Sequence, residues 1–371
     1  MKLSLSRLLS LLLFAFAAEL CSADDFQDLS TRAAAARDAN DVAQAVALYR
    51  KALDINPQWQ EGWWFLGTLL YDSDQYAPGR DAFQHFVDLN AQAAPGWAFL
   101  GLCEFEQGDY ARALKDVERG LALGADKETQ LAPVLSYHEA LLLTREGEFD
   151  HALEKYAALT RAMQGTSPNK SLLVSIGLAA LRTPLLPKDV APAQEELYVL
   201  AGKATSFIFA AEYSQADATF RELLARYGQT ANVHYMHGVY LMARDPDEAF
   251  REFQRELEIF PSSAAANKML AWGLLTRGDS EAALPYAEKA AKAPETAVFG
   301  EYLLGRALVE TGDVRRGLPL LEKAEAEDAS NWDTHIALAA AYSRAGRPQQ
   351  ARRERELAMH MDEEGGAVAQ R

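Results

Sequence analysis

The residues best suited to chemistry are two histidines in the segment NVHYMHG, from Asn232 to Gly238. His234 and His237 are three residues apart, a spacing that puts two imidazoles on one face of a helix, where they could bind a metal ion. Neither a cysteine nor a carboxylate at a matching spacing completes the ligand set. We therefore predict that both histidines serve packing or hydrogen bonding, and that the chain has no metal site.

Two other segments resemble catalytic or phosphate-binding motifs, and both are incomplete. His138 and Glu139 would begin an HExxH zinc motif, but Leu142 stands where the second histidine belongs. Gly202 begins GKATS, but Leu197 replaces the earlier glycine of a phosphate-binding loop. No Gly-x-Ser-x-Gly motif is present. The sequence therefore predicts neither an enzyme nor a bound cofactor.

The segment TRGDS, from Thr276 to Ser280, contains the Arg-Gly-Asp tripeptide of cell-adhesion ligands. The same place in neighbouring segments holds QGD, from Gln107 to Asp109, and TGD, from Thr311 to Asp313. We predict that the tripeptide is an ordinary turn between two helices.

The sequence repeats with an internal period of 34 residues. Several independent columns keep this spacing: Leu29, Trp63 and Trp97; Ala33, Gly67 and Gly101; Leu270, Leu304 and Leu338; Gly278, Gly312 and Gly346. Within each copy the apolar residues follow helical spacing, first over one helix and then, after a turn, over a second.

These features resemble the tetratricopeptide repeat. The resemblance rests on the period, on a large residue followed by Leu-Gly, on the second-helix column and on repeat-ending prolines: Trp63, Leu66 and Gly67; Trp97, Leu100 and Gly101; Ala45, Tyr49 and Ala52; Pro57 and Pro261. It implies an all-α solenoid of about nine helix-turn-helix repeats that form a right-handed superhelix with a concave inner face.

The expected organisation has five parts: a cleaved signal peptide over 1–23, an array of about four repeats over 24–166, an irregular segment over 167–196, an array of about five repeats over 197–365, and a flexible tail over 366–371. Residues Ser171 to Arg182 resemble a lone first helix. Pro184, Pro187 and Pro192 then prevent a continuous helix. This segment is either a degenerate tenth repeat or a long loop that divides two arrays.

The N-terminus has the pattern of a secretory signal. Lys2 and Arg7 precede an apolar stretch over 8–18 that is too short to span a bilayer comfortably. We expect cleavage after Ala23 and a periplasmic or secreted location, with no transmembrane segment thereafter. The alternative is a lipoprotein anchored at Cys21. Once Cys21 is lost, Cys103 is the only thiol, so no internal disulfide forms, and its apolar surroundings predict a buried residue.

The adjacent Trp63 and Trp64 predict the binding surface. The resemblance implies that Trp63 packs between the helices of its own copy, whereas Trp64, about 100° around the helix, faces the concave groove. The same positions in other copies complete the candidate partner-binding set: Trp64, Tyr71, Phe105, Tyr137, Tyr235, Lys268, Trp272, Tyr302 and Arg306. The alternative is that these rings only pack against the next copy.

The family's carboxylate clamp uses Lys and Asn at fixed groove positions, and it is absent here. In the first three copies those positions hold Ser30, Ala34, Trp64, Thr68, Ala98 and Leu102. Recognition of an acidic C-terminal peptide of the chaperone type is therefore not expected.

The net charge of the chain narrows the classes of partner that it could bind. The formal net charge of -16 disfavours nucleic acid and anionic membranes as partners. We expect a non-enzymatic exported scaffold that binds a protein or peptide in an aromatic groove, in a setting such as cell-envelope assembly. One alternative is a ligand-binding or catalytic accessory at residues 167–196, which contain Lys188, Asp189, Glu195 and Glu196. The other is a structural module that self-associates.

Overall fold

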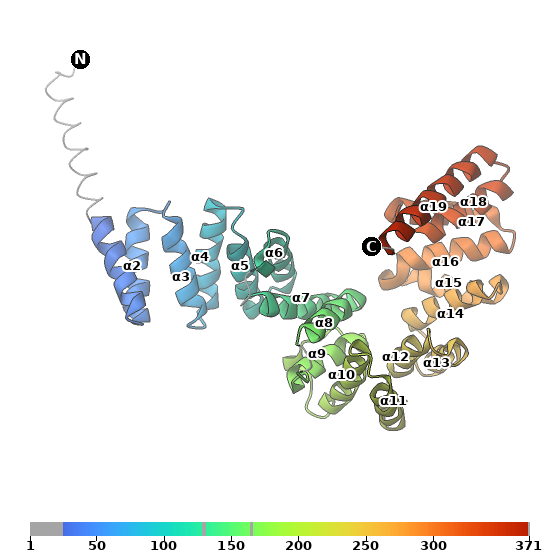
Figure 1. Ribbon diagram of the computed structural model, residues 1–371, viewed down its shortest axis with the longest axis horizontal. Coiled ribbons are helices and arrows are strands. Elements are labelled where there is room, and N and C mark those ends of the chain that lie inside the picture. Colours follow the sequence, from blue (N-terminus) through green and yellow to red (C-terminus); the bar gives the residue numbers. More distant parts are fainter. Residues whose placement is uncertain (1–24, 128–130, 164–165, 370–371) are drawn as a thin grey trace, which may run out of the picture. The chain divides into compact units, whose positions relative to one another are not determined.

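A computed structural model describes residues 25–127, 131–163 and 166–369 (Figure 1). The expected signal peptide and Cys21 lie outside these residues. The chain forms two compact units, which are treated separately below. The first comprises Met1–Ser167 with Pro184–Leu186, and the second comprises Pro168–Thr183 with Pro187–Arg371. The described residues of both units are helical and contain no strand.

The first unit begins with a helix over residues 25–38. Its other helices are α2 (Val42–Ile55), α3 (Gln60–Tyr71), α4 (Tyr76–Leu89), α5 (Ala94–Gln107), α6 (Tyr110–Ala122), α7 (Ala132–Glu146) and α8 (Phe149–Ala162). A short 3-10 turn, η1 (Ala125–Lys127), follows α6 where the 34-residue register is lost.

The second unit contains more helices. They are α9 (Lys170–Ala180), α10 (Glu195–Phe209), α11 (Tyr213–Tyr227), α12 (Val233–Leu241), α13 (Pro246–Ile259), α14 (Ala264–Thr276), α15 (Ser280–Lys292), α16 (Ala297–Glu310), α17 (Val314–Glu327), α18 (Trp332–Arg344) and α19 (Pro348–Ala369). Two 3-10 turns, η2 (Pro187–Asp189) and η3 (Pro294–Thr296), join them.

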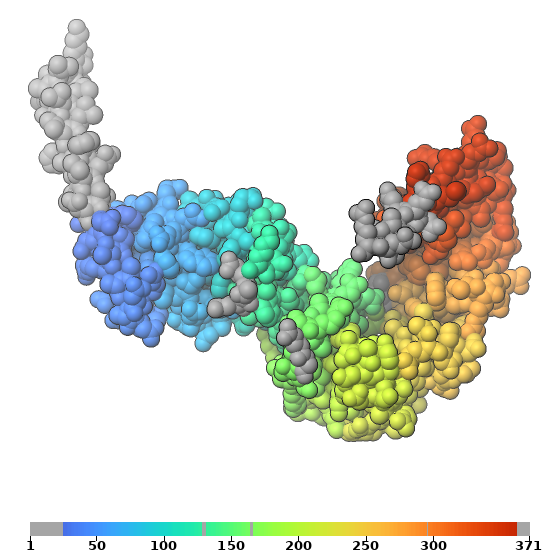
Figure 2. All heavy atoms as spheres, in the orientation of Figure 1, coloured from blue at the N-terminus to red at the C-terminus, as the bar shows by residue number. Residues whose placement is uncertain are grey.

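In the part of the chain that the structure describes, these helices pair into nine helix-turn-helix copies, with α9 as an additional helix. Each helix packs mainly on its immediate neighbours in the chain, with smaller contacts to the helix after next. Figure 2 shows the same order, since the colour changes gradually from one copy to the next within each unit. The predicted all-α solenoid of tetratricopeptide type is therefore confirmed.

The Leu-Gly column is explained by close packing within a copy. A Cβ atom at Gly67 of α3 would lie 2.8 Å from the Phe83 ring of α4, closer than real Cβ contacts. The glycine therefore lets the large aromatic residue of the second helix approach the first helix. Phe83 is fully buried as a result.

In the described residues, most turns between paired helices use a left-handed residue, and in five copies it is glycine: Gly108, Gly147, Gly278, Gly312 and Gly346. Gly278 has a φ of 80°, and the Asp279 side chain accepts a hydrogen bond from Ala282 N at 3.2 Å, which caps α15. The Arg-Gly-Asp tripeptide is therefore a helix C-terminus followed by a helix N-cap, as predicted.

The segment over 167–196 contains one helix and one strap. Helix α9 packs on α10, and Gly177 and Gly202 lie where a Cβ atom on either would collide with the backbone of the other helix. Residues Pro184–Leu186 then belong to the first unit, where Leu186 is buried among its core residues. Arg145 Nη1 of α7 donates a hydrogen bond to Pro184 O at 2.9 Å, which fixes the strap.

The C-terminal helix is longer than predicted. Helix α19 extends to Ala369, so residues 366–369, where we expected a tail, are helical. Gly365 and Gly366 are poor helix formers, at about 1 kcal/mol each relative to alanine. A helix that is already nucleated can extend through them at this modest cost.

Candidate partner-binding site

Trp63 and Trp97 occupy the same repeat position and use their indole N–H groups inside the fold. Trp63 Nε1 donates to Pro57 O at 2.8 Å, and Trp97 Nε1 donates to Ala91 O at 3.0 Å. Each bond ties a first helix to the turn that precedes it. The Trp63 ring also stacks on His85 of α4, with ring centroids 4.3 Å apart. This column therefore serves the fold, as the sequence predicted for Trp63.

Trp64 is half-buried and is held by rings from its own and the next copy. Its centroid lies 5.8 Å from Phe83 and 5.3 Å from Phe86, both on α4, and 5.6 Å from Phe99 on α5. The Trp64 ring therefore packs against the next copy through Phe99, as the alternative prediction stated. Within the described residues, however, the Trp64 indole N–H makes no hydrogen bond, unlike those of Trp63 and Trp97.

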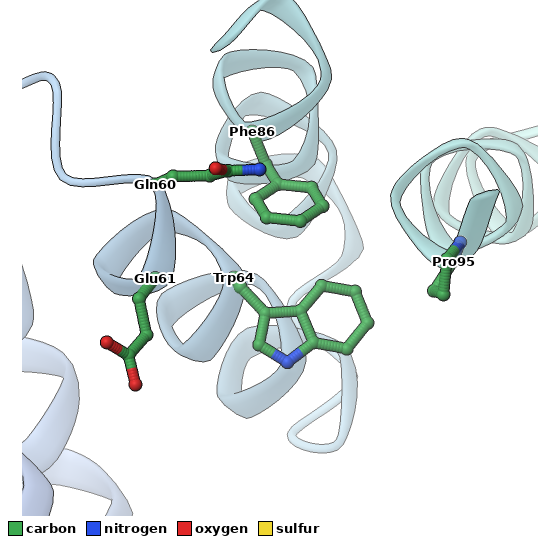
Figure 3. A pocket seen from close by; sticks show the side chains of 5 residues that line it. All are labelled: Gln60, Glu61, Trp64, Phe86 and Pro95. Atoms are coloured by element: carbon green, nitrogen blue, oxygen red, sulfur yellow. The ribbon is translucent and has the colours of Figure 1, made fainter. Parts of the chain in front are cut away.

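The free edge of Trp64 borders a hollow of about 340 Å³, lined by Gln60, Glu61, Trp64, Phe86 and Pro95. Figure 3 shows the indole extending from α3 toward Pro95 of α5, with the Phe86 ring beside it and the Glu61 carboxylate pointing away. We call this the Trp64 hollow. Its floor is apolar, and its rim carries an amide and one negative charge.

A second hollow, of about 230 Å³, lies in the second unit around Trp272. Helices α13 and α14 supply most of its lining: Met242, Pro246, Ala249, Phe250, Phe253, Met269, Trp272, Gly273, Thr276 and Arg277. The Arg277 guanidinium lies 4.8 Å above the Phe250 ring and pairs with Asp247 at 2.7 Å. Flexible methionines at the edge suit contact with apolar groups of varied shape.

Three of the predicted groove residues are not exposed, and that part of the prediction is wrong. Phe105, Tyr235 and Tyr302 are only 7, 6 and 3% exposed. Each is packed into the core of its unit. The reason is that neighbouring copies lie close enough to bury a large ring at these helical positions.

The remaining candidates are half-buried and differ in their surroundings. Tyr71 meets Phe99 with centroids 5.2 Å apart, so it shares that ring with Trp64, and burial raises the pKa of its phenol to about 12. Arg306 pairs with Glu310 at 2.8 Å and donates to Tyr302 Oη and Leu275 O, so its charge is used within the fold. Tyr137 and Lys268 lie elsewhere, on α7 and α14. The structure therefore brings Trp64 and Tyr71 together around Phe99, and Arg306 together with the buried Tyr302.

Phe86 and Pro95 are the lining residues that the sequence argument missed. Both lie outside the first-helix positions that the family pattern assigns to the groove. The high density of aromatic residues in EGWWFLG, FQHF and GWAF was the available signal, because three adjacent aromatic helices cannot all bury every ring.

The His234 and His237 pair is completed by a carboxylate that sequence spacing did not show. Glu252 of α13, 2% exposed, places Oε2 at 2.5 Å from His234 Nδ1 and 3.4 Å from His237 Nδ1. Arg255 pairs with its other oxygen. Burial alone would raise the pKa of Glu252, but the contacts with His234 and His237 outweigh burial and hold it well below the usual range.

A second histidine-carboxylate pair lies between α18 and α19. His335 Nδ1 lies 2.7 Å from Glu354 Oε2, and His335 Nε2 lies 3.1 Å from Ala329 O. Burial lowers the pKa of His335, but the bond to Glu354 outweighs it, so the pKa is raised. Glu325 of α17 lies beside this pair.

The first unit contains a pair of acids, the buried Glu104 of α5 and the half-buried Asp116 of α6. Burial and the negative charge of Asp116 together raise the pKa of Glu104 to about 8. Burial also raises the pKa of Asp116. Next to Glu104, Cys103 is fully buried, and burial raises its pKa to about 12, so it is a packing residue as predicted.

The charged residues at the end of the 167–196 segment join helices. Glu195 pairs with Lys170 of α9 at 2.7 Å, and Glu196 pairs with Arg226 of α11 at 2.5 Å. They extend from α10 toward two different helices and do not converge on one site. In the described residues, no helix is long and apolar enough to cross a membrane.

Comparison with known proteins finds one matching repeat family and several similar solved structures. A family model described as tetratricopeptide repeat matches residues 66–128, 239–297 and 302–358. No curated protein matches the chain. Similar solved structures include "Crystal structure of MamA protein", 15% identical with a TM-score of 0.39, covering 47% of this chain and 95% of that one. Another is YrrB, titled a TPR protein with an unusual peptide-binding site, 19% identical with a TM-score of 0.38, covering 43% and 82%.

Proposed function

This chain is a tetratricopeptide repeat protein, and from that premise we propose that it is a non-enzymatic exported scaffold that holds a protein or peptide partner at the Trp64 hollow. Stacked repeats present large surfaces, and their function lies in the side chains that those surfaces display. The observation that carries the proposal is the half-buried Trp64, whose indole N–H has no partner in the described residues and whose edge borders an apolar hollow.

The chemistry of the hollow defines the partner. A tryptophan edge with Phe86 and Pro95 suits one large apolar side chain, the kind of anchor that supplies most interface energy. Glu61 at the rim and the net charge of -16 favour lysine or arginine next to that anchor. The partner is therefore a segment that combines an aromatic or large aliphatic residue with a basic neighbour. The hollow around Trp272 offers a second anchor site of similar character.

A displayed peptide library tests this proposal. We expect selection on the purified chain to enrich peptides with an apolar anchor beside a basic residue. Trp64→Ala should weaken their binding at least tenfold, because loss of a central aromatic anchor costs about 2 kcal/mol or more. Binding is measured by calorimetry, under conditions in which light scattering gives the mass of a single chain.

Trp332→Ala is the matched control, because Trp332 is 45% exposed and borders neither hollow. It should leave the affinity unchanged. Peptides that bind wild type and Trp64→Ala equally would contradict the Trp64 hollow as the site.

The exported location is part of the same proposal. It is supported by the basic Lys2 and Arg7, the short apolar stretch after them and the small residues that end at Ala23. Mass spectrometry of the protein from its native cell should find an N-terminus at Asp24. A lipid on Cys21 would instead favour the anchored alternative, and an intact N-terminus would contradict export by signal cleavage.

A further inference from the structure

Three possible metal ligands meet where α17, α18 and α19 pack together. They are Glu325, His335 and Glu354, one from each helix, and their ligand atoms all lie within 4.8 Å of one another. His335 is 1% exposed and Glu354 is 7% exposed, while Glu325 is half-buried and gives access from solvent. The cluster therefore has two buried ligands and one open side.

The imidazole of His335 is oriented by a group outside the cluster. Its Nε2 lies 3.1 Å from Ala329 O, a carbonyl that can only accept a hydrogen bond, so Nε2 carries the proton. Nδ1 then faces the carboxylates, 2.7 Å from Glu354 Oε2. A metal-binding histidine characteristically donates its other N–H to a carbonyl in this way, which fixes the ring and its tautomer.

The equivalent pair in an earlier copy shows what is different here. His234 and Glu252 also join a first helix to a second, but Arg255 pairs with that carboxylate. Around His335 the third group is instead another carboxylate, Glu325. In the described residues, no lysine or arginine forms an ion pair with Glu325 or Glu354. Two carboxylates beside one imidazole leave a local negative charge that a cation would balance.

We propose that Glu325, His335 and Glu354 form a binding site for one divalent transition-metal ion of the zinc type. An imidazole with two carboxylates is a ligand set for Zn²⁺, whereas Mg²⁺ and Ca²⁺ prefer oxygen ligands alone. Zinc–ligand bonds of about 2.0–2.2 Å require the three atoms to surround one point, which small side-chain adjustments achieve from the present spacing. The ion takes the place of the proton between His335 Nδ1 and Glu354, and water completes the coordination on the open side.

The consequence of binding is a link across the last helices of the second unit. One ion held by all three residues joins α17 to α19 directly, in addition to the packing of each on α18. Since a ligand that binds only the folded state stabilises it, Zn²⁺ should protect these helices against unfolding.

Calorimetric titration of the full, chelator-treated and untagged chain with Zn²⁺ tests the proposal. We expect uptake of one ion per chain and a rise in thermal midpoint with Zn²⁺, but not with Mg²⁺. Glu325→Gln should weaken Zn²⁺ binding at least tenfold. This half-buried residue has no described ion pair, so the variant should keep its fold, which circular dichroism checks.

His335→Gln should abolish the uptake. His234→Gln is its matched control, because it removes a histidine that also contacts a buried glutamate, but one whose charge is already paired with Arg255. The control should bind Zn²⁺ like wild type. The proposal is overturned if wild type takes up no ion, if Glu325→Gln and wild type bind equally, or if His234→Gln loses the ion as well.

Discussion

Trp63 and Trp64 are adjacent, but they differ in the hydrogen bonding of their indole N–H groups. Trp63 Nε1 is bonded to Pro57 O at 2.8 Å, and the Trp64 indole N–H has no such bond in the residues described. The same division recurs one copy later, where Trp97 bonds to Ala91 O and its neighbour is Ala98. A tryptophan at the edge of a hollow whose N–H makes no hydrogen bond within the fold can donate that hydrogen bond to a ligand.

This difference predicts opposite effects of two conservative substitutions. Trp63→Phe keeps a ring but leaves Pro57 O without its donor, so we expect a loss of about 1 kcal/mol in the free energy of unfolding. Trp64→Phe removes no bond and should change stability by less than half as much. Urea unfolding followed by circular dichroism measures both, and equal losses would contradict the assigned roles.

Glu104 predicts a stability that falls as pH rises. The pKa of its carboxyl is raised to about 8 in the folded chain, against about 4.3 for an ordinary glutamate. Between these values the folded chain holds a proton that the unfolded chain has released, so the free energy of unfolding decreases with pH. Glu104→Gln, which cannot ionise, should be more stable than wild type by about 1 kcal/mol or more near pH 8. It should show little difference near pH 4.

Glu106→Gln is the control for that experiment, because Glu106 is an exposed glutamate on the same helix. Its stability should follow wild type at each pH. A Glu104→Gln variant that is less stable than wild type at both pH values would show that the carboxyl is ionised and stabilising in the folded chain.

Glu252 predicts the opposite pH dependence. The groups that face it are His234, His237 and Arg255, and Arg255 also pairs with Glu248. Because its folded pKa is depressed, its contribution is complete above the ordinary value of about 4.3 and is lost as pH falls below it. Glu252→Gln should cost about 3 kcal/mol at neutral pH, and the difference from wild type should shrink in acid. A penalty that stays constant down to about pH 3 would contradict this.

At the scale of single elements, most of the turns between paired helices contain one residue with a left-handed backbone conformation. Gly312 has a φ of 101° and its added Cβ would meet no atom within 4 Å, so backbone strain alone opposes a side chain there. Ala211 holds the corresponding turn of another copy at a φ of 57°, where a Cβ is strained.

Two exchanges at these turns should therefore change stability in opposite directions. Gly312→Ala should lower the free energy of unfolding by about 1–2 kcal/mol, and Ala211→Gly should raise it by up to about 1 kcal/mol. Urea unfolding of both variants beside wild type measures the changes. Shifts of the same sign would show that local packing, and not the backbone angle, controls these turns.

At the scale of the whole molecule, the sequence was informative about the contacts that follow the repeat pattern within a copy. The period predicted the helix pairs, the Leu-Gly packing of Gly67 on Phe83 and the turn at Gly278. It did not predict contacts that depend on how one copy meets the next. Burial of Phe105, Tyr235 and Tyr302 is of that kind. The position of Phe86 beside Trp64 is a contact within one copy that the repeat pattern does not include. Glu252 was missed because it lies on α13, the partner helix of α12, where no spacing along one helix could reveal it.

The strap at Pro184–Leu186 has a consequence for how the chain acquires its structure. Contacts elsewhere join neighbouring helices, so contact order is low and each copy can form as soon as the following one is available. The strap is an exception, because Leu186 completes a cluster that contains Ala98 and Leu135. A chain that emerges N-terminus first, from a ribosome or a translocation channel, cannot finish its first unit until α9 has also emerged. Synthesis or export that pauses before residue 184 would therefore leave an open core.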